Sequence, residues 1–374
     1  MENNFVQTDK NDQLFLSVTR IDVPTGIGYH IDINTCKHWA VNSVVKKVTR
    51  NDVARLAGVS PAVVSYVLSN SNYVSKEKRE AVLRAAKELN YSPNLFAKGL
   101  RTNRSFSIAL VGDSLQEELF GPLSVQLLDN GFYSSLFYSQ IKETFIQRII
   151  DGRFDAVFMT SNGFTAQQLN RIVESGTPVL LYKSRNYPDL SEKIVAMAPD
   201  FFDGVLQAMR YLIGKGHRHI GYVPPLHYRT NGFGGDDFRI QAYEKALEEN
   251  NLRKDPNYIC CHTECFASIE ADVKAMLQLP PEQRVTALVV GDDHLAAKVM
   301  QSVRSWNLSI PKDLAVVGWG NISSASITTP QLTTVDASIT AFAHDVARAL
   351  VTLANGQPLE EKVYPVHLVI REST

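Results

Sequence analysis

The sequence lacks the features that would take a chain into or across a membrane. It has no run of about 18 apolar residues, and its first thirty residues show no basic start followed by an apolar stretch. Cysteine is scarce: there are four among 374 residues, and the crowding of Cys260, Cys261 and Cys265 is not a disulfide framework. We therefore expect a cytoplasmic protein without a membrane partner, whose 44% apolar residues can build a sizeable core.

Net charge is nearly absent too, but the charges are unevenly distributed. The formal net charge is −1, yet residues 44–105 contain twelve basic and four acidic side chains. Residues 1–43 contain three basic and five acidic ones. A strongly basic region in an otherwise acidic chain is typical of a surface that binds a polyanion such as DNA.

Within the basic region, the sequence predicts two short helices joined at Gly58. Thr49 and Asp52 can cap the first helix, and Gly58 can adopt the left-handed conformation that ends it. Ser60 can cap the second helix, with Pro61 at its first position, where a missing N–H costs little. The expected apolar seam consists of Ala54, Leu56, Ala57, Val64, Val67 and Leu68. This is the pattern of a helix-turn-helix, a DNA-binding motif.

A third helix should follow, from Ser75 as its N-cap to a left-handed stop at Asn90. Its apolar face is formed by Val82, Leu83, Ala86 and Leu89. Residues 94–100 can add one or two helical turns, which are marginal alone in water. Residues 1–43 show no core-forming pattern, so we expect a disordered extension, or a non-native one if translation begins at the valines that follow it.

From residue 106 onward, apolar runs of strand length alternate with helical stretches. The runs are 108–111, 132–137, 156–159, 179–181, 220–223, 287–290 and 316–317. Such alternation predicts an α/β fold with parallel sheets between helices, and this many strands favour two subdomains. Ligands in such folds bind at the carboxyl ends of strands, so Asp113, Asp292 and Trp319 are the first candidates for a binding site.

Several motifs match a known family at its spacings. They are Asp52-Val-Ala-x-x-Ala-Gly-Val-Ser60, Tyr91-x-Pro-Asn94, Ala97-x-x-Leu100-Arg101, Gly216-His-Arg-His-Ile-Gly221, Val290-Gly-Asp-Asp-His-Leu-Ala296 and Ile310-Pro-x-Asp-Leu-Ala-Val-Val-Gly318. On these motifs, residues 48–374 resemble the LacI/GalR family of bacterial transcription repressors. The resemblance implies an all-α helix-turn-helix domain followed by a core of two subdomains like those of periplasmic binding proteins.

The resemblance also implies domain boundaries. We expect the helix-turn-helix domain at 44–93, a hinge helix and linker at 94–105, and a core for effector binding and dimerisation at 106–374. The chain in this family crosses three times between the subdomains. The expected N-subdomain is about 106–183 and 332–357, and the expected C-subdomain is about 184–330 and 360–371.

The residues that the resemblance implies for DNA contact fall into two groups. In the motif they are Thr49, Ser60, Pro61, Ala62, Val63, Ser65 and Tyr66, and in the hinge they are Asn94, Ala97 and Leu100. Leu100 matches a leucine that wedges into the minor groove in relatives, although it could also simply end a linker helix. Val63 and Tyr66 replace the usual Thr and Arg. Because arginine can hold a guanine through two hydrogen bonds and tyrosine cannot, we expect an altered operator.

The expected effector site consists of Asp113, Arg239, Asp292 and Trp319. Arg239 aligns with an arginine that contacts effector in relatives, and a guanidinium suits a carboxylate or a phosphate. Asp292 aligns with a residue that binds sugar hydroxyls. Two simpler interpretations remain open, in which Arg239 is a solvated helix charge and Asp292 is a helix N-cap. Gly320 stands where the family usually has an acid.

Other clusters do not predict catalysis. Adjacent cysteines near residue 260 rarely close a tetrahedral site, so no metal and no cofactor are expected. His217 is interpreted as a structural residue that ties a helix end to the next strand. No nucleophile lies in a recognisable set with a base, so we expect a protein that is not an enzyme.

The sequence thus predicts a transcription regulator, specifically a repressor that acts in the nucleoid as a homodimer on a palindromic double-stranded DNA operator. Its expected effector is a sugar or sugar derivative between the subdomains. Two alternatives stay open: a DNA-binding regulator controlled by a protein partner or by nothing, and a small-molecule binding protein.

Overall fold

The computed structural model of the chain describes residues 48–69, 74–91, 99, 102, 104–113, 117–140, 143–226 and 236–374. The chain divides into two compact units, Met1–Pro93 and Asn94–Thr374. The expected extension at 1–43 and the hinge residues Asn94, Ala97 and Leu100 lie outside the described residues. In the described ranges, no helix is long and apolar enough to cross a bilayer.

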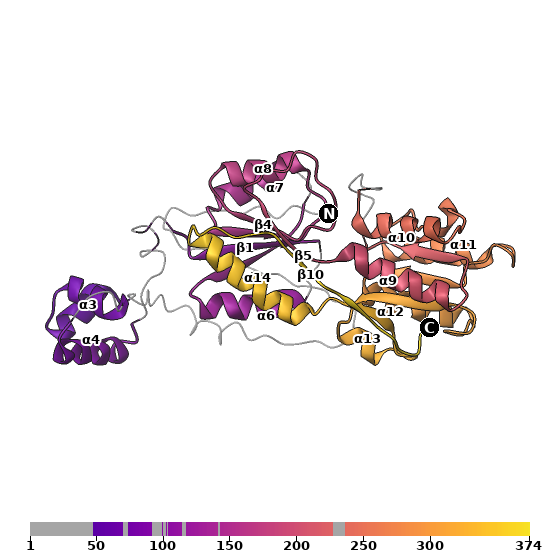
Figure 1. Cartoon of the computed structure of the whole chain (residues 1–374). Coiled ribbons are helices and arrows are strands. Elements are labelled where there is room, and N and C mark those ends of the chain that lie inside the picture. Colours follow the sequence, from indigo (N-terminus) through magenta and orange to yellow (C-terminus); the bar gives the residue numbers. More distant parts are fainter. Residues whose placement is uncertain are drawn as a thin grey trace, which may run out of the picture. The chain divides into compact units, whose positions relative to one another are not determined.

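The described part of the first unit consists of helices α2 (Arg50–Ala57), α3 (Pro61–Ser69) and α4 (Lys76–Glu88) (Figure 1). The carboxylate of Asp52 accepts hydrogen bonds from the backbone N–H of Thr49 at 2.9 Å and from its hydroxyl at 2.6 Å. Gly58 ends α2 with φ at 65°, and Asn90 follows α4 with φ at 48°. The predicted cap and turn residues are therefore confirmed.

The small core of this unit corrects two of the predicted contacts. Its buried side chains are Val53, Ala54, Val64, Val67, Val82, Ala85 and Ala86. Leu56 is 47% exposed and Leu83 is 50% exposed, although both were expected in the core. On α2 the buried face is centred between Val53 and Ala54, and a helix turns 100° per residue, which carries Leu56 off this face. The same geometry moves Leu83 off the face of α4.

The second unit contains two sheets, of which the first has six parallel strands in the order β10-β5-β4-β3-β1-β2. The strands are β1 (Ser107–Gly112), β2 (Tyr133–Tyr138), β3 (Ala156–Met159), β4 (Val179–Leu181), β5 (Val195–Pro199) and β10 (Lys362–Tyr364). Helices α6 (Glu117–Asp129) and α14 (Ile339–Ala354) pack on one face, and α7 (Glu143–Asp151) and α8 (Ala166–Glu174) pack on the other (Figure 1).

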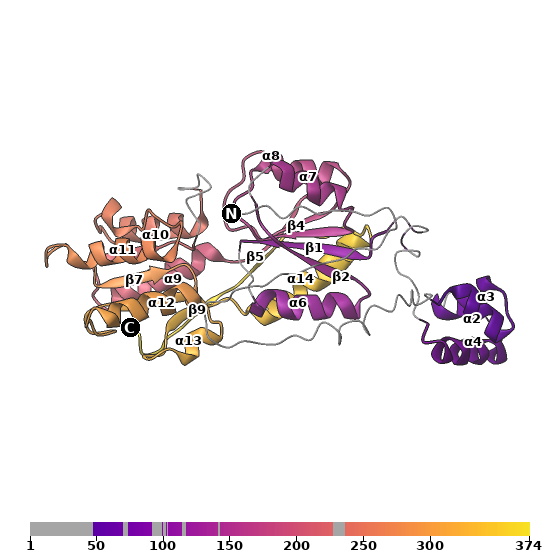
Figure 2. The ribbon, with the colours of Figure 1, turned by 180° about the vertical axis from the view of Figure 1, so that it is seen from behind.

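The second sheet has five strands in the order β11-β9-β8-β7-β6, with β11 antiparallel to β9. The strands are β6 (Ile220–Val223), β7 (Ala287–Val290), β8 (Ala315–Gly320), β9 (Thr333–Asp336) and β11 (His367–Val369). Helices α9 (Phe201–Gly214) and α10 (Phe238–Glu249) cover one face, and α11 (Phe266–Gln278) and α12 (Asp293–Ser305) cover the other (Figure 2). Short helices η1 (Pro256–Tyr258) and α13 (Ser323–Ile327) complete the unit.

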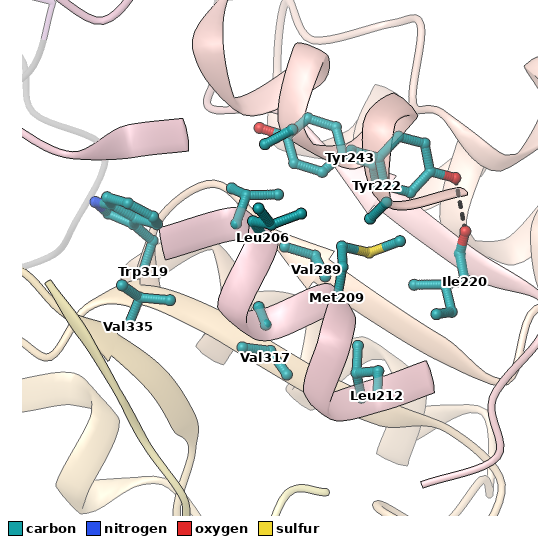
Figure 3. Close-up of a cluster of buried hydrophobic side chains, with 14 of the residues drawn as sticks. Leu206, Met209, Leu212, Ile220, Tyr222, Tyr243, Val289, Val317, Trp319 and Val335 are labelled. Carbon is teal, nitrogen blue, oxygen red and sulfur yellow. Dashed lines mark hydrogen bonds between the residues drawn. The ribbon is translucent and has the colours of Figure 1, made fainter. Parts of the chain in front are cut away.

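Between α9, α10 and the second sheet lies an apolar cluster that extends to Trp319 (Figure 3). Tyr243 is buried there, and its hydroxyl donates a hydrogen bond to the carbonyl of Ile220 at 2.7 Å. Burial raises the pKa of Tyr243 far above the physiological range, so the hydroxyl stays protonated and remains a donor. This packing fixes the position of Trp319 at the end of β8.

The chain crosses between the sheets three times, but later than expected. β5 pairs with β4 in the first sheet, although residues 184–330 were expected in the C-subdomain. β9 pairs with β8 in the second sheet and β10 pairs with β5 in the first, which also reverses the expected placement. These strands have three to five residues each, and a pattern that short does not specify which sheet it joins.

Candidate functional site

The N-terminal turn of α3 presents side chains to solvent. Ser60, before the helix, and Ala62 are exposed, and Tyr66 one turn later is 40% exposed. The hydroxyl of Ser60 accepts a hydrogen bond from the backbone N–H of Val63 at 3.4 Å. Val63, another predicted contact residue, packs against the small core and is turned inward. Ser60, Ala62 and Tyr66 therefore form the accessible reading face.

A hydrogen bond between α2 and α3 occupies one predicted DNA contact. The guanidinium of Arg50 donates to the hydroxyl of Ser65 at 2.8 Å, and that hydroxyl donates to the carbonyl of Pro61 at 3.1 Å. The bond fixes the angle between the two helices. Thr49 is exposed at the start of α2, where its backbone N–H and its hydroxyl donate to the carboxylate of Asp52.

Helices α2 and α4 of the same unit carry exposed basic side chains. Those exposed are Arg55, Lys76, Lys78, Arg84 and Lys87. Arg55 pairs with Asp52, and an exposed pair of this kind is easily exchanged for another partner. The unit therefore exposes basic side chains that can contact phosphates, alongside the acidic side chains of Glu77, Glu80 and Glu88 on α4.

In the second unit, the expected effector residues line one cavity of about 360 Å³ between the two sheets. Asp113 follows β1, Asp292 follows β7, Trp319 lies near the end of β8 and Arg239 lies in the first turn of α10. Three of these positions are carboxyl ends of parallel strands, as predicted. The volume falls in the range of roughly 300–1,000 Å³ that small-molecule sites occupy.

Asp292 both caps a helix and lines the cavity. Its carboxylate accepts a hydrogen bond from the backbone N–H of Leu295 at 2.8 Å, at the start of α12. Burial raises its pKa, which the bond to Leu295 and the nearby His294 and Arg239 partly offset. The helix-cap interpretation is correct, and it leaves the second carboxylate oxygen for another donor.

Arg239 is not a solvated charge, which overturns one of the interpretations left open. It is 5% exposed, and its Nε and Nη2 donate to the carboxylate of the fully buried Asp237 at 3.0 and 2.7 Å. Its guanidinium carbon also lies 4.9 Å from the ring centroid of Phe201. Asp237 thus occupies the Nε–Nη2 edge of the guanidinium, which is one of the two edges that can hold a carboxylate.

Trp319 forms an aromatic wall with an unused donor. Its ring stacks on Phe201 with centroids 5.3 Å apart, and it is 7% exposed. Its Nε1–H is buried and has no hydrogen-bond partner among the described residues. A Cβ on Gly204 of α9 would come within 2.4 Å of the indole, so glycine at that position makes room for Trp319. A buried donor without an acceptor is costly unless a ligand supplies one.

Sequence reasoning missed Asp293, the carboxylate beside Asp292. Asp293 is fully buried and accepts hydrogen bonds from the hydroxyl of Thr334 at 2.6 Å and the backbone N–H of Ile322 at 3.0 Å. Burial raises its pKa to about 6. A Cβ on Gly318 would lie 2.2 Å from its carboxylate, so that glycine permits the contact. Its role is to join α12 to β8 and β9.

The remaining predicted clusters are structural. The imidazole of His217 forms a hydrogen bond with the hydroxyl of Thr286 at 2.9 Å, which ties the end of α9 to the start of β7, as predicted. Burial strongly raises the pKa of the Cys260 thiol, which disfavours metal binding there. In the part of the chain that the structure describes, no group of three or more His, Cys, Asp or Glu residues could hold a metal ion.

Comparison with known proteins identifies both units. The family described as bacterial regulatory proteins, lacI family, matches residues 49–94, and the periplasmic binding protein-like domain matches residues 209–374. The HTH-type transcriptional repressor PurR of Proteus mirabilis is 31% identical over 308 residues, covering 77% of this chain and 84% of that protein. The chain belongs to the LacI family. It is a DNA-binding transcription repressor with the predicted fold class.

One further relative and two solved structures match this chain over most of its length. The NTD biosynthesis operon regulator NtdR of Bacillus subtilis is 27% identical, covering 87% of this chain and 99% of that protein. A lac repressor dimer bound to operator and an anti-inducer has a TM-score of 0.72 at 23% identity, covering 88% of this chain and 99% of that one. The transcriptional regulator CelR in complex with cellobiose has a TM-score of 0.60 at 27% identity, covering 87% of this chain and all of that one.

Proposed function

We propose that a homodimer of this chain represses transcription from a two-fold symmetric operator, and that a carbohydrate-like effector in the cavity sets its affinity for DNA. One observation carries the proposal. Asp113, Arg239, Asp292 and Trp319 lie far apart in the sequence, yet they converge on a single ligand-sized cavity. The unpartnered Nε1–H of Trp319 supports a bound molecule that carries an acceptor oxygen.

The reading face of α3 supports sequence-specific binding. Tyr66 projects from the helix with one hydroxyl and one ring, which can donate a single hydrogen bond or contact a thymine methyl group. The exposed lysines of α4 supply phosphate contacts that help to position α3 in the major groove, while Arg50 holds α3 through Ser65.

The homodimer is supported by an apolar surface on the second unit. Val125 and Leu128 of α6 are 59% and 57% exposed, and on β2, an edge strand of the six-stranded sheet, Tyr133, Leu136 and Tyr138 are about half exposed. Large exposed apolar surfaces mark interaction sites, and a second copy of the chain presents the same surface. Two copies also supply two α3 helices for a symmetric operator.

Control by an effector follows from where the cavity lies. Its wall takes Asp113 and Glu118 from the first sheet and its helices, and Arg239, Asp292 and Trp319 from the second. A ligand that binds one arrangement of the two sheets more tightly shifts the protein toward that arrangement. By linkage, DNA must then change the affinity for the ligand by the same factor.

The test is operator selection from random DNA with the full chain, followed by fluorescence anisotropy on the selected site with and without a panel of sugars. We expect one palindromic site and a shift in affinity with a subset of the sugars. The variant Trp319→Phe should keep operator affinity and lose the sugar response, because it removes the N–H donor. Trp306→Phe, outside the cavity at the end of α12, is the matched control. Specific DNA binding that no sugar alters would overturn the effector, and binding as a monomer in sedimentation would overturn the dimer.

A further inference from the structure

The cavity wall is rich in carboxylates. Asp113 and Glu118 line it from the first sheet and α6, and Asp292 lines it from the second sheet. Their hydrogen-bond donors are neutral: the hydroxyl of Ser161 donates to Asp113 at 2.6 Å and the hydroxyl of Ser323 donates to Glu118 at 2.9 Å. The ion pairs among the described residues do not include any of these three carboxylates.

The cations of the wall do not balance these acids. The charge of Arg239 is matched by the buried carboxylate of Asp237 at 2.7 Å. Lys298 and His294 of α12 are exposed, and the ammonium of Lys298 lies 5.6 Å from the ring centroid of Phe266. Even if His294 is counted as a cation, the three carboxylates outnumber the remaining cations among the described residues that line the cavity. The cavity therefore attracts positive charge.

The rest of the wall suits the same kind of ligand. Tyr182, Phe201 and Trp319 supply aromatic surface, which binds cations over its faces and the C–H faces of sugar rings. The buried Nε1–H of Trp319 can donate a hydrogen bond to an acceptor on the ligand, such as a hydroxyl or ring oxygen. The ligand should thus combine a positive group with several oxygens.

We infer that the effector is a hydroxylated amine, an amino sugar or related amino polyol, whose ammonium group is held by the carboxylates of Asp113, Glu118 and Asp292. The inference rests on the proposed function and names the class of effector for that cavity. The ammonium donates hydrogen bonds to carboxylates, and the hydroxyls accept from Trp319. A phosphorylated or carboxylated sugar is disfavoured, because it would meet three like charges in the wall, where Asp237 already matches the charge of Arg239.

The test is calorimetric titration of the full chain with matched probes. For each of the gluco, galacto and manno epimers, the 2-amino hexose is compared with three probes. These are the parent hexose, the N-acetylated amino hexose and the 6-phosphate of the parent hexose. We expect at least one amino hexose to bind about 10- to 100-fold more tightly than its hexose, because a hydrogen bond to a charged group adds that much affinity. Acetylation removes the charge and should abolish the preference.

Variants that each neutralise one carboxylate test which side chains hold the ammonium group. Asp292→Asn keeps the helix cap and Glu118→Gln keeps an acceptor for Ser323, so both should fold. Each should lower the ratio of amino hexose to hexose affinity about 10-fold, whatever it does to the affinity for the hexose itself. Glu117→Gln, on the same helix but outside the cavity wall, is the control and should leave the ratio unchanged.

The outcomes separate this inference from the function it rests on. Equal or tighter binding of the neutral, acetylated or phosphorylated sugars overturns the amine and leaves the carbohydrate effector in place. An unchanged ratio in both variants overturns the assignment to these carboxylates. If no probe binds while operator binding is intact, the amine and the carbohydrate effector both fail.

Discussion

In the helix-turn-helix unit the basic side chains of α4 lie on the surface, whereas in the second unit two arginines are buried against aspartates. Lys76, Lys78, Arg84 and Lys87 are exposed. Arg239 pairs with Asp237 at 2.7 Å, and Arg185 pairs with Asp236 at 2.8 Å. Exposed basic side chains remain available to bind a polyanion, whereas each buried arginine is already paired with an aspartate and holds the chain in place beside the cavity.

The difference shows that the number of basic and acidic residues in a sequence predicts a binding surface only where those side chains are exposed to solvent. The surplus of basic residues in the first unit corresponds to a surface that can neutralise phosphates. In the second unit, Arg239 counts as a cation in the sequence but contributes little net charge to the cavity, because Asp237 has already matched it.

The largest expected effect tests this contrast through salt. If the unit neutralises about six phosphates, operator affinity should fall roughly 10³-fold between 50 and 200 mM salt. Sugar binding in the cavity should change less than about twofold, since buried charges are screened much less. Anisotropy and calorimetry on the same preparations give both slopes. Similar salt dependence for the two ligands would remove the distinction between the units.

Breaking a buried pair should have the next largest effect. Asp237→Asn leaves the guanidinium of Arg239 buried without its counter-charge, which should cost about 3–5 kcal/mol of unfolding free energy. Glu249→Gln removes the partner of Lys245 from an exposed pair at 3.8 Å and should change stability by less than about 1 kcal/mol. Urea denaturation measures both. A small loss for Asp237→Asn would mean that the guanidinium reaches water.

The buried Asp293 should make the stability of the second unit depend on pH. Its folded pKa is raised to about 6 from 3.8, so the folded state binds the proton more tightly than the unfolded state. Stability from this group is therefore present at low pH and is lost as pH rises through about 4 to 6, by about 3 kcal/mol in total. Asp293→Asn should remove this loss, seen as diverging unfolding free energies between pH 4 and pH 7. Parallel pH profiles would show that Asp293 does not titrate in this range.

The smallest expected effect lies on the reading face. Tyr66→Arg should move operator preference toward a guanine at the facing position by roughly 1–3 kcal/mol of discrimination, because arginine holds guanine through two hydrogen bonds. Tyr66→Phe keeps the ring and serves as the control for the hydroxyl. Selection from random DNA reads out both variants. Recovery of one identical site for all three proteins would show that Tyr66 does not face the bases.

The sequence predicted the local features of both units well. Capping at Thr49 and the left-handed turns at Gly58 and Asn90 depend on neighbours within a few residues, and all three are confirmed. The placement of β5, β9 and β10 depends on pairing between segments far apart, and the expected crossings were wrong for that reason. Leu56 and Leu83 were predicted in the core because they are apolar, but their positions around the helix axis place them outside the buried face.

The candidate site shows the same division. Strand ends predicted Asp113, Asp292 and Trp319, since position along a parallel strand is a local property. The pairing of Arg239 with Asp237 could be suspected from two residues of opposite charge two positions apart, but their burial could not. The roles of Phe201 and Asp293 depend on contacts between elements that are far apart in the sequence. The spacing of residues along the chain does not reveal such contacts.

Gly204 gives one position outside the cavity control over what can enter it. Since a methyl group there would meet the indole of Trp319 at 2.4 Å, Gly204→Ala must displace the ring that forms one wall of the cavity. A single codon change behind the wall would in this way alter which molecules the cavity accepts, while every residue that lines it stays the same.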